Sequence, residues 1–131
     1  CVPEKIHHLE NDKQYDIVIN YYSFQEMTKN NVIAYTNFIK KNLKKDGIFI
    51  SSNSWDPVKY EIKQFSDLQL HNFEIIDIYN DPRSIGMKQL VVVCKNTLHN
   101  KKIDIEKLNK LALYLRDNKI KKEDFLNNIY S

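Results

Sequence analysis

The chain has 131 residues, enough for one domain with one hydrophobic core. Its apolar content of 42% excludes a disordered chain, and 20 basic against 17 acidic side chains leave a net charge of only +3. The lysines occur in pairs rather than in a dense basic stripe, and arginine is found only at Arg83 and Arg116. This pattern argues against nucleic acid as the main partner.

Glycine is scarce, with 2 residues in the whole chain. Glycine-rich turns are the usual means of bringing backbone amides against a phosphate or a cofactor ribose. The sequence has no such turn, and it begins with Cys1 rather than with Met. We therefore expect these residues to be the C-terminal part of a longer protein, whose first strands lie outside them.

The cysteines and the hydropathy indicate the cellular compartment in which the protein is expected. Cys94 lies in an apolar run and is expected to be a small buried thiol. Cys1 has no CxxC partner, so the spacing predicts neither a disulfide framework nor a zinc site. No segment approaches the run of about 18 apolar residues that a membrane span needs. We expect a cytoplasmic protein.

The most informative stretch begins with a short strand. Residues 15–19 are nearly continuous in apolar side chains, as expected for a parallel strand that helices cover on both faces. A polar and aromatic loop at 20–26 follows directly. In open α/β sheets, ligands bind in the crevice beyond the carboxyl ends of the parallel strands. This loop is therefore where we expect chemistry.

A helix and a second strand come next. Apolar side chains recur at helical spacing over 31–43, and either Thr28 or Asn30 can cap the start of this helix. Asp46-Gly47 is expected to end the helix and to open a strand at 48–52. A helix that returns through a tight turn is half of a βαβ unit, so we expect the two strands to pair in parallel.

The next segments predict a weaker helix and a hairpin. The helix is expected over 60–68, and alternation of apolar and polar side chains predicts a strand over 73–79. Turn residues at 80–86 separate it from the β-prone run at 90–94. This connection is shorter than the dozen or more residues of a parallel crossover, so the two strands should pair antiparallel.

The last part of the chain changes character. A polar linker at 96–102 leads to a helix predicted over 104–117, and Phe125, Leu126 and Ile129 mark a second, shorter helix. Three docking places remain open for these helices: the sheet, the missing part of the protein, or another subunit in a homo-oligomer.

The order of strand, helix, strand, helix and closing hairpin resembles the second half of the class I S-adenosylmethionine-dependent methyltransferase fold. That fold ends with an antiparallel strand in an otherwise parallel sheet. The motifs resemble those of the sugar O-methyltransferase family of bacterial surface-polysaccharide clusters, over roughly residues 1–95. They are Tyr15-Asp16-Ile17-Val18-Ile19-Asn20, Ser23-Phe24-Gln25-Glu26-Met27, Tyr35, Ile39, Gly47-Ile48-Phe49 and Asn53.

This resemblance implies the C-terminal half of a Rossmann-type methyltransferase sheet at 1–96 and a helical C-terminal extension at 97–131. It implies S-adenosylmethionine as cofactor and a sugar or glycan hydroxyl as acceptor, in polysaccharide biosynthesis. The family's Gly-rich turn and the acidic residue that holds the cofactor ribose would both lie in the missing part. These residues alone are therefore expected to bind the cofactor poorly or not at all, and to be inactive.

Candidate cofactor contacts and a candidate base lie in the loop after the first strand. Asn20, Tyr21 and Ser23 are expected to contact the cofactor, although Asn20 could instead bond its own backbone. Glu26 is the candidate catalytic residue, because methyl transfer to a hydroxyl requires removal of its proton. Alternatively, Glu26 anchors substrate hydroxyls or is the acidic first-turn residue of the next helix. His7-His8 could lie at the crevice, although solvent exposure is the simpler expectation.

Candidate substrate contacts come from two loops. Gln25 is placed to bond a sugar hydroxyl, and Phe24 to form part of an apolar wall. Asn53 and Trp55 follow the second strand, where the indole could support a sugar ring or could simply belong to the core. Arg83 could contact an anionic group or be solvated. No cluster has the spacing of metal ligands, so no metal is predicted.

Two other functions remain open. A non-catalytic α/β binding or scaffold module is one, because fold alone does not decide function. A methyltransferase with a small-molecule or nucleic-acid acceptor is the other. Asn20-Tyr21-Tyr22-Ser23 is faintly similar to the Asn-Pro-Pro-Tyr loop of amino-methylating enzymes, but both prolines are absent.

Overall fold

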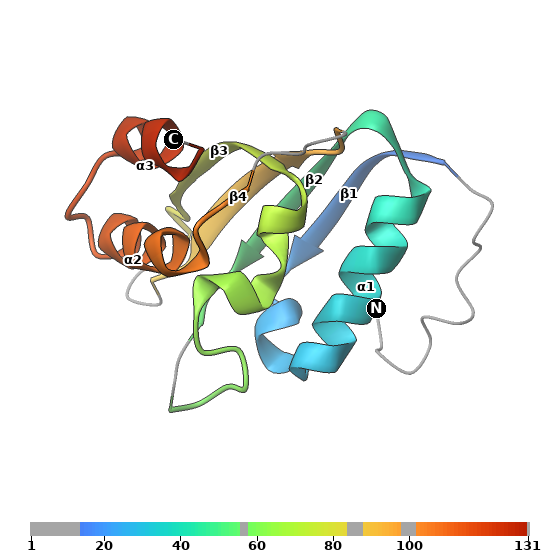
Figure 1. Cartoon of the computed structure of the whole chain (residues 1–131). Coiled ribbons are helices and arrows are strands. Elements are labelled where there is room, and N and C mark those ends of the chain that lie inside the picture. The colour runs from blue at the N-terminus through green and yellow to red at the C-terminus, as the bar shows by residue number, and fades with distance from the viewer. Residues whose placement is uncertain (1–13, 56–57, 84–87, 98–101, 131) are drawn as a thin grey trace.

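A four-stranded sheet of mixed direction organises the chain (Figure 1). The computed structural model describes residues 14–55, 58–83, 88–97 and 102–130. The strands are β1 (Tyr15–Tyr21), β2 (Leu43–Asn53), β3 (Glu74–Asn80) and β4 (Leu90–Lys95). They lie in the order β1-β2-β4-β3, so the last strand along the chain is inserted between β2 and β3.

Strand directions agree with the sequence-based expectations. β1 pairs with β2 in parallel, and β4 is antiparallel to both β2 and β3. The predicted parallel pair and the predicted antiparallel hairpin are therefore confirmed. Because β4 alone runs in the opposite direction, β1, β2 and β3 end at the same edge of the sheet.

The first helix is followed by a bulge rather than by a glycine cap. Helix α1 (Lys29–Asn42) begins after Thr28, whose side chain accepts a hydrogen bond from the Asn31 amide, so Thr28 and not Asn30 is the cap. The prediction that Asp46-Gly47 ends the helix is wrong, because the backbone is already extended at Leu43. Pairing with β1 then jumps from Leu43 to Ile48, and the intervening residues bulge out of the ladder.

Gly47 has a steric reason to be glycine. A Cβ atom there would lie 2.8 Å from both the Leu43 side chain and the Lys44 carbonyl oxygen. Asp46 takes the left-handed conformation, with φ of 63°. Asn96, directly after β4, holds the bulge, since its amide donates to the Gly47 carbonyl and its carbonyl accepts from the Asp46 amide. Two main-chain hydrogen bonds, one at Asp46 and one at Gly47, therefore hold the bulge in place.

The helix predicted over 60–68 is wrong in type. Two short 3₁₀ turns replace it, η3 (Phe65–Leu68) and η4 (Leu70–Asn72). The Asp67 carboxylate accepts the amides of Lys63 and Gln64, and Gln69 between the turns is left-handed, with φ of 61°. A left-handed residue stops a right-handed helix from continuing. The apolar residues still reach the core, as the buried set of Ile62, Phe65 and Leu68 shows.

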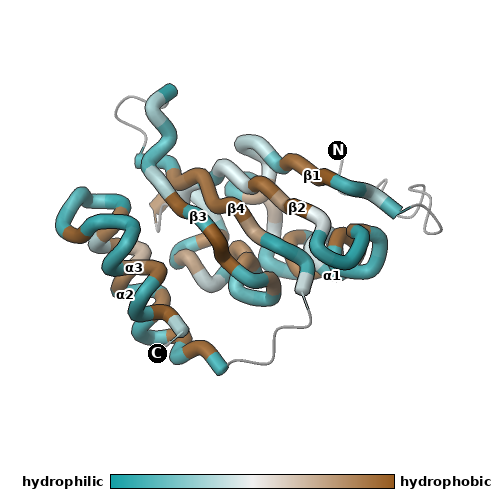
Figure 2. Tube along the Cα trace, turned by 90° about the horizontal axis from the view of Figure 1, so that it is seen from above, coloured by the Kyte–Doolittle hydropathy of each residue, from teal (hydrophilic) through white to brown (hydrophobic). Residues whose placement is uncertain are grey.

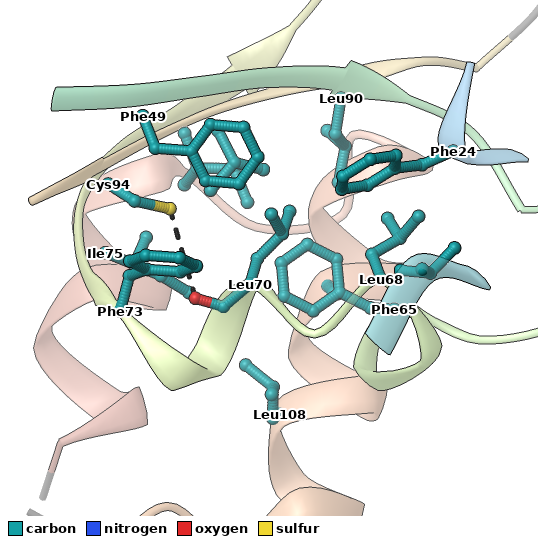
Figure 3. Packing of buried hydrophobic residues seen from close by; sticks show 14 of the residues in the cluster. Phe24, Phe49, Phe65, Leu68, Leu70, Phe73, Ile75, Leu90, Cys94 and Leu108 are labelled. Atoms are coloured by element: carbon teal, nitrogen blue, oxygen red, sulfur yellow. Dashed lines mark hydrogen bonds between the residues drawn. The ribbon is translucent and has the colours of Figure 1, made fainter. Parts of the chain in front are cut away.

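The two C-terminal helices pack against strand β3 of the sheet. Helix α2 (Ile105–Arg116) begins after Asp104, whose carboxylate accepts the Lys107 amide, and α3 (Lys122–Ile129) follows. Both contact β3 and each other, and α2 also contacts η3. Leu108, labelled in Figure 3, belongs to the same buried cluster as the residues of the sheet, and so does Phe125. Three docking places were considered for these helices, and the structure shows them packed on the sheet.

One face of the sheet is packed and the other is open. In Figure 3, the packed face carries Phe49 and Cys94 against the 3₁₀ turns. The opposite face bears an apolar patch, here called the open sheet face. Its members are Ile17, Ile19, Ile48, Ile50 and Val93. Figure 2 shows the Cα trace of the sheet from above, with hydrophobic residues on its strands. The expected cover of helices on both faces is thus found on one face among the described residues.

Candidate functional site

The carboxyl ends of three strands meet at one edge of the sheet. β1 ends beside β2, with Asn20 opposite Ser51. Leu90 of β4 lies opposite both Asn53 and Asn80, so the ends of β2 and β3 are level with each other. The loop predicted to carry chemistry therefore lies beside the residues that follow β2 and β3.

Asn53 connects the residues at this edge. Its side chain is 1% exposed, and its Oδ1 accepts the Gln25 backbone amide at 3.2 Å. Its Nδ2 donates to Asn20 Oδ1 at 2.5 Å and to Ser51 Oγ at 2.8 Å. The Asn20 amide in turn donates to Ser23 Oγ. We call Asn20, Ser23, Gln25 and Asn53 the edge cluster; each was a site candidate from the sequence, and the structure brings them together.

Gln25 joins the loop after β1 to the loop after β2. Its side chain is 3% exposed, and its Oε1 accepts the Ser54 backbone amide at 3.0 Å and the Ser54 hydroxyl at 3.3 Å. Its Nε2 donates to the Tyr60 hydroxyl at a longer 3.5 Å. Both ends of the amide are thus engaged within the protein, so in this conformation Gln25 holds loops in place.

Glu26 presents a carboxylate to solvent beside the edge cluster. It is the last residue of the 3₁₀ turn η2 (Phe24–Glu26), and its backbone amide donates to the Ser23 carbonyl. Within the described part of the chain, its side chain makes no hydrogen bond or ion pair. The idea that Glu26 lies in the first turn of the next helix is wrong, because α1 begins only after its cap at Thr28.

A cavity opens between β1 and α1, next to the edge cluster. Its volume is about 310 Å³. Asn20, Tyr21 and Ser23 contribute to its wall, and the rest of the lining is mainly apolar. The remaining residues are Val18, Ile19, Phe24, Met27, Tyr35, Phe38 and Ile39. The predicted cofactor contacts therefore share one cavity.

Two aromatic candidates are largely buried. Phe24 is 1% exposed and packs its ring against Tyr35 and Phe49. Trp55 is 5% exposed, with its indole edge-to-face with Phe65 and the Arg116 guanidinium 5.0 Å from the ring centroid. In this conformation, therefore, neither ring offers a free face to a sugar.

Sequence reasoning missed a second polar group at this edge. The buried Asp81 carboxylate accepts from Arg83 Nε and Nη2, both at 3.0 Å, and from Ser52 Oγ at 2.9 Å. These Arg83 hydrogen bonds are the main reason that the pKa of Asp81 falls to about 2. The guanidinium also lies 4.7 Å from the Tyr21 ring centroid. The sequence signal was the Asp81-Pro82-Arg83 turn, which predicts either a solvated Arg83 or a contact with an anionic group, but not this ion pair.

Several further candidates give no additional site. His7-His8 lie outside the described residues. Among the residues that the structure describes, no group of three His, Cys, Asp or Glu side chains is arranged to hold a metal ion. No described helix is long and apolar enough to cross a membrane.

Comparison with known proteins gives no family. No protein-family model matches the sequence, and no curated protein matches it either. The resemblance to sugar O-methyltransferases therefore stays a prediction that depends on the motifs themselves.

Proposed function

We propose that this chain forms the acceptor-side half of an S-adenosylmethionine-dependent O-methyltransferase that acts on a sugar or glycan hydroxyl. The observation that carries the proposal is the sheet: three strands run in one direction, and the last strand is antiparallel and inserted between the second and third. The resemblance implies this single reversed strand at the end of the fold. The edge cluster lies at the carboxyl edge, where open α/β sheets bind their ligands.

The cavity between β1 and α1 suits only part of the cofactor. Its apolar lining, with Asn20 and Ser23 at the rim, fits the sulfonium end of the molecule. Neither a glycine-rich turn nor a carboxylate for the ribose hydroxyls lines it. The proposal therefore needs a polypeptide segment outside these 131 residues to hold the adenosyl part. When bound, the cofactor supplies an electrophilic methyl group.

The chain's own contribution is to position the acceptor and to accept its proton. Hydrogen bonds of the edge cluster fix the turn η2, so the Glu26 carboxylate is carried on a held backbone. Glu26 itself does not line the cavity, but Phe24 and Met27, close to it in sequence, do. An exposed carboxylate carried there can accept the proton of an attacking hydroxyl. Most of the rate enhancement is expected from holding the acceptor oxygen in line with the donor, because no covalent intermediate is needed.

The test is Glu26→Gln in the full-length protein. We expect turnover to fall by about 10²-fold or more, which is the usual contribution of a general base. Affinity for S-adenosylhomocysteine should change less than about twofold, because the amide keeps the shape of the side chain. Methyl transfer to glycan and calorimetric titration measure the two quantities. Glu123→Gln, an exposed carboxylate on α3, is the matched control.

Two outcomes contradict the role of Glu26. Equal losses in turnover and in cofactor affinity would indicate a cofactor or structural residue. An unchanged turnover would show that the carboxylate does not take part.

One observation favours a second function, a binding or scaffold module. On the open sheet face, the exposed fraction is 59% for Ile17 and 67% for Ile19. Exposed apolar side chains that lie together are typical of a protein-binding surface. Calorimetric titration of S-adenosylhomocysteine into the full-length protein, with this chain alone as the control, discriminates the two. Micromolar binding by the full-length protein supports the enzyme, and its absence supports the module.

A further inference from the structure

A second cavity lies on the other side of Trp55, between α2 and the segment that precedes η3. Its volume is about 450 Å³. Trp55, Leu113 and Tyr114 form its apolar wall, and Lys63, Lys110 and Arg116 supply cationic groups. We call this cavity the cationic groove. It begins one residue after Ser54, which the edge cluster holds through Gln25, so the groove adjoins the candidate site.

The positive charge of the groove is poorly balanced. Within the described residues, the ammonium groups of Lys63 and Lys110 form no ion pair. Arg116 is 16% exposed at its side chain and approaches Asp117 at 3.4 Å, but the same carboxylate oxygen also accepts from Lys88 at 3.1 Å. None of the residues that line the groove is acidic.

The acidic residues nearest to the groove in sequence do not neutralise it. Glu61, two residues before Lys63, accepts the Lys29 backbone amide at 3.3 Å and forms no ion pair among the described residues. Asp67 turns its carboxylate to the backbone amides of Lys63 and Gln64, and the ammonium group of Lys29 lies 3.7 Å from it. Glu106 lies one helical turn before Lys110, but no ion pair joins them in the described structure. The groove therefore keeps a net positive charge.

Each aromatic ring of the groove has a cation beside it, although Lys119 lies outside the lining. The Arg116 guanidinium lies 5.0 Å from the Trp55 ring centroid, and the Lys110 and Lys119 ammonium groups each lie 5.8 Å from that of Tyr114. Aromatic and aliphatic surfaces pack against the C–H face of a sugar ring, whereas cations bind an acidic substituent. Together these chemistries fit one ligand class: a carbohydrate with an acidic group.

We propose that the cationic groove binds the acidic group of an anionic carbohydrate, as a carboxylate or a phosphate. The inference rests on the proposed function, since it makes the methyl acceptor an acidic sugar whose charged part lies beyond Trp55. Lys63 and Lys110 bind the acidic group together with Arg116, whose Nη1 also donates to the Trp55 carbonyl at 3.3 Å. Leu113 and Tyr114 contact the ring. The groove thereby selects acidic over neutral acceptors.

The protein contains a built-in reporter for this binding. Trp55 is the only tryptophan of the sequence, so all tryptophan fluorescence comes from a residue that lines the groove. We expect a saturable change when tetragalacturonic acid is titrated into the protein at low salt, and none with the neutral maltotetraose. The apparent affinity should fall as salt is added, because exposed charges are screened. Glucuronate and glucose 6-phosphate, compared as single sugars, distinguish carboxylate from phosphate.

A pair of double variants separates the groove from general charge. Lys63→Gln with Lys110→Gln should weaken binding about tenfold, the effect of losing two partly exposed ion pairs. Lys41→Gln with Lys45→Gln removes the same charge from α1 and β2 and should leave the affinity unchanged. Both pairs are surface changes, and circular dichroism checks that each variant is folded.

Three results overturn the proposal: no fluorescence change with any acidic sugar, equal binding of the neutral tetrasaccharide, or equal losses in the two double variants. The titration uses no cofactor, so its outcome is independent of the methyltransferase test. Binding in the groove without any binding of S-adenosylhomocysteine by the full-length protein would overturn the enzyme and leave the groove as a carbohydrate site.

Discussion

Replacement of Asn53 by Ala is the most direct perturbation of the edge cluster. The change removes the acceptor of the Gln25 amide and the donors to Asn20 and Ser51. A buried polar group left without a partner costs about 1–3 kcal/mol. The Gln25 amide is buried and bears the full cost. Asn20 is only partly buried, so water can replace its lost partner, and the buried Ser51 hydroxyl loses one donor only. We expect a loss of about 2–3 kcal/mol in the free energy of unfolding.

Urea denaturation of the 131-residue chain measures this loss, followed by Trp55 fluorescence and by far-ultraviolet circular dichroism. Asn127→Ala is the matched control, because Asn127 is exposed on α3 and alanine there costs nothing in helix propensity. Asn53→Asp sharpens the test: it keeps the acceptor for Gln25 but buries a carboxylate opposite the Asn20 oxygen. It should therefore destabilise the chain at least as much as alanine does.

The reasoning would be refuted if Asn53→Ala unfolded within about 0.5 kcal/mol of the Asn127→Ala control. Such a result would mean that packing, rather than the hydrogen bonds, holds the two loops together, and that the edge cluster is not a rigid support for Glu26.

Two further predictions concern titratable groups. The pKa of Asp81 is lowered to about 2, so its stabilising effect should be complete above about pH 4 and be lost as the pH falls through 2. After allowance for solvent screening at the exposed Arg83, this is worth about 1 kcal/mol. Acid titration of unfolding should show the loss, and Asp81→Asn should abolish it; an identical acid profile in both proteins would contradict the pair. Burial raises the pKa of the Cys94 thiol, so in the Cys1→Ser chain Ellman's reagent should react only after urea unfolds the protein. Rapid reaction of the native chain would show that β4 is not buried as described.

The strands were predictable because their short apolar runs indicate a strand without knowledge of the tertiary structure. Residues 90–94 are a continuous apolar run, and residues 15–19 are interrupted only by Asp16, so both segments favour a strand. The first helix was predictable from its apolar period and from the Thr28 cap. The segment at 60–68 was not, because its apolar spacing fits a helix while Asp67 and the left-handed Gln69 favour short turns. Side-chain bonds to the backbone decided that segment, and periodicity does not detect them.

Most residues of the candidate site were predictable, but the hydrogen bonds that join them were not. Asn20, Gln25 and Asn53 were each candidates, but the bonds that join them span 28 and 33 residues of sequence. Arg83 was a candidate, but its ion pair with Asp81 was missed, because the surroundings of the pair include Ser52 and Tyr21, which only the sheet brings near. Trp55 shows the same limit, since the cation above its ring comes from α2.

The open sheet face has a consequence for how the chain behaves in solution. β1 forms one edge of the described sheet, and Ile17 and Ile19 stand uncovered beside that edge. A free strand edge next to exposed isoleucines is a template on which a second chain can add its own strand. Self-association would withdraw apolar surface from water and stabilise the folded form by mass action. Unfolding midpoints of this chain are therefore expected to rise with protein concentration, so a dilution series is part of any stability measured on it.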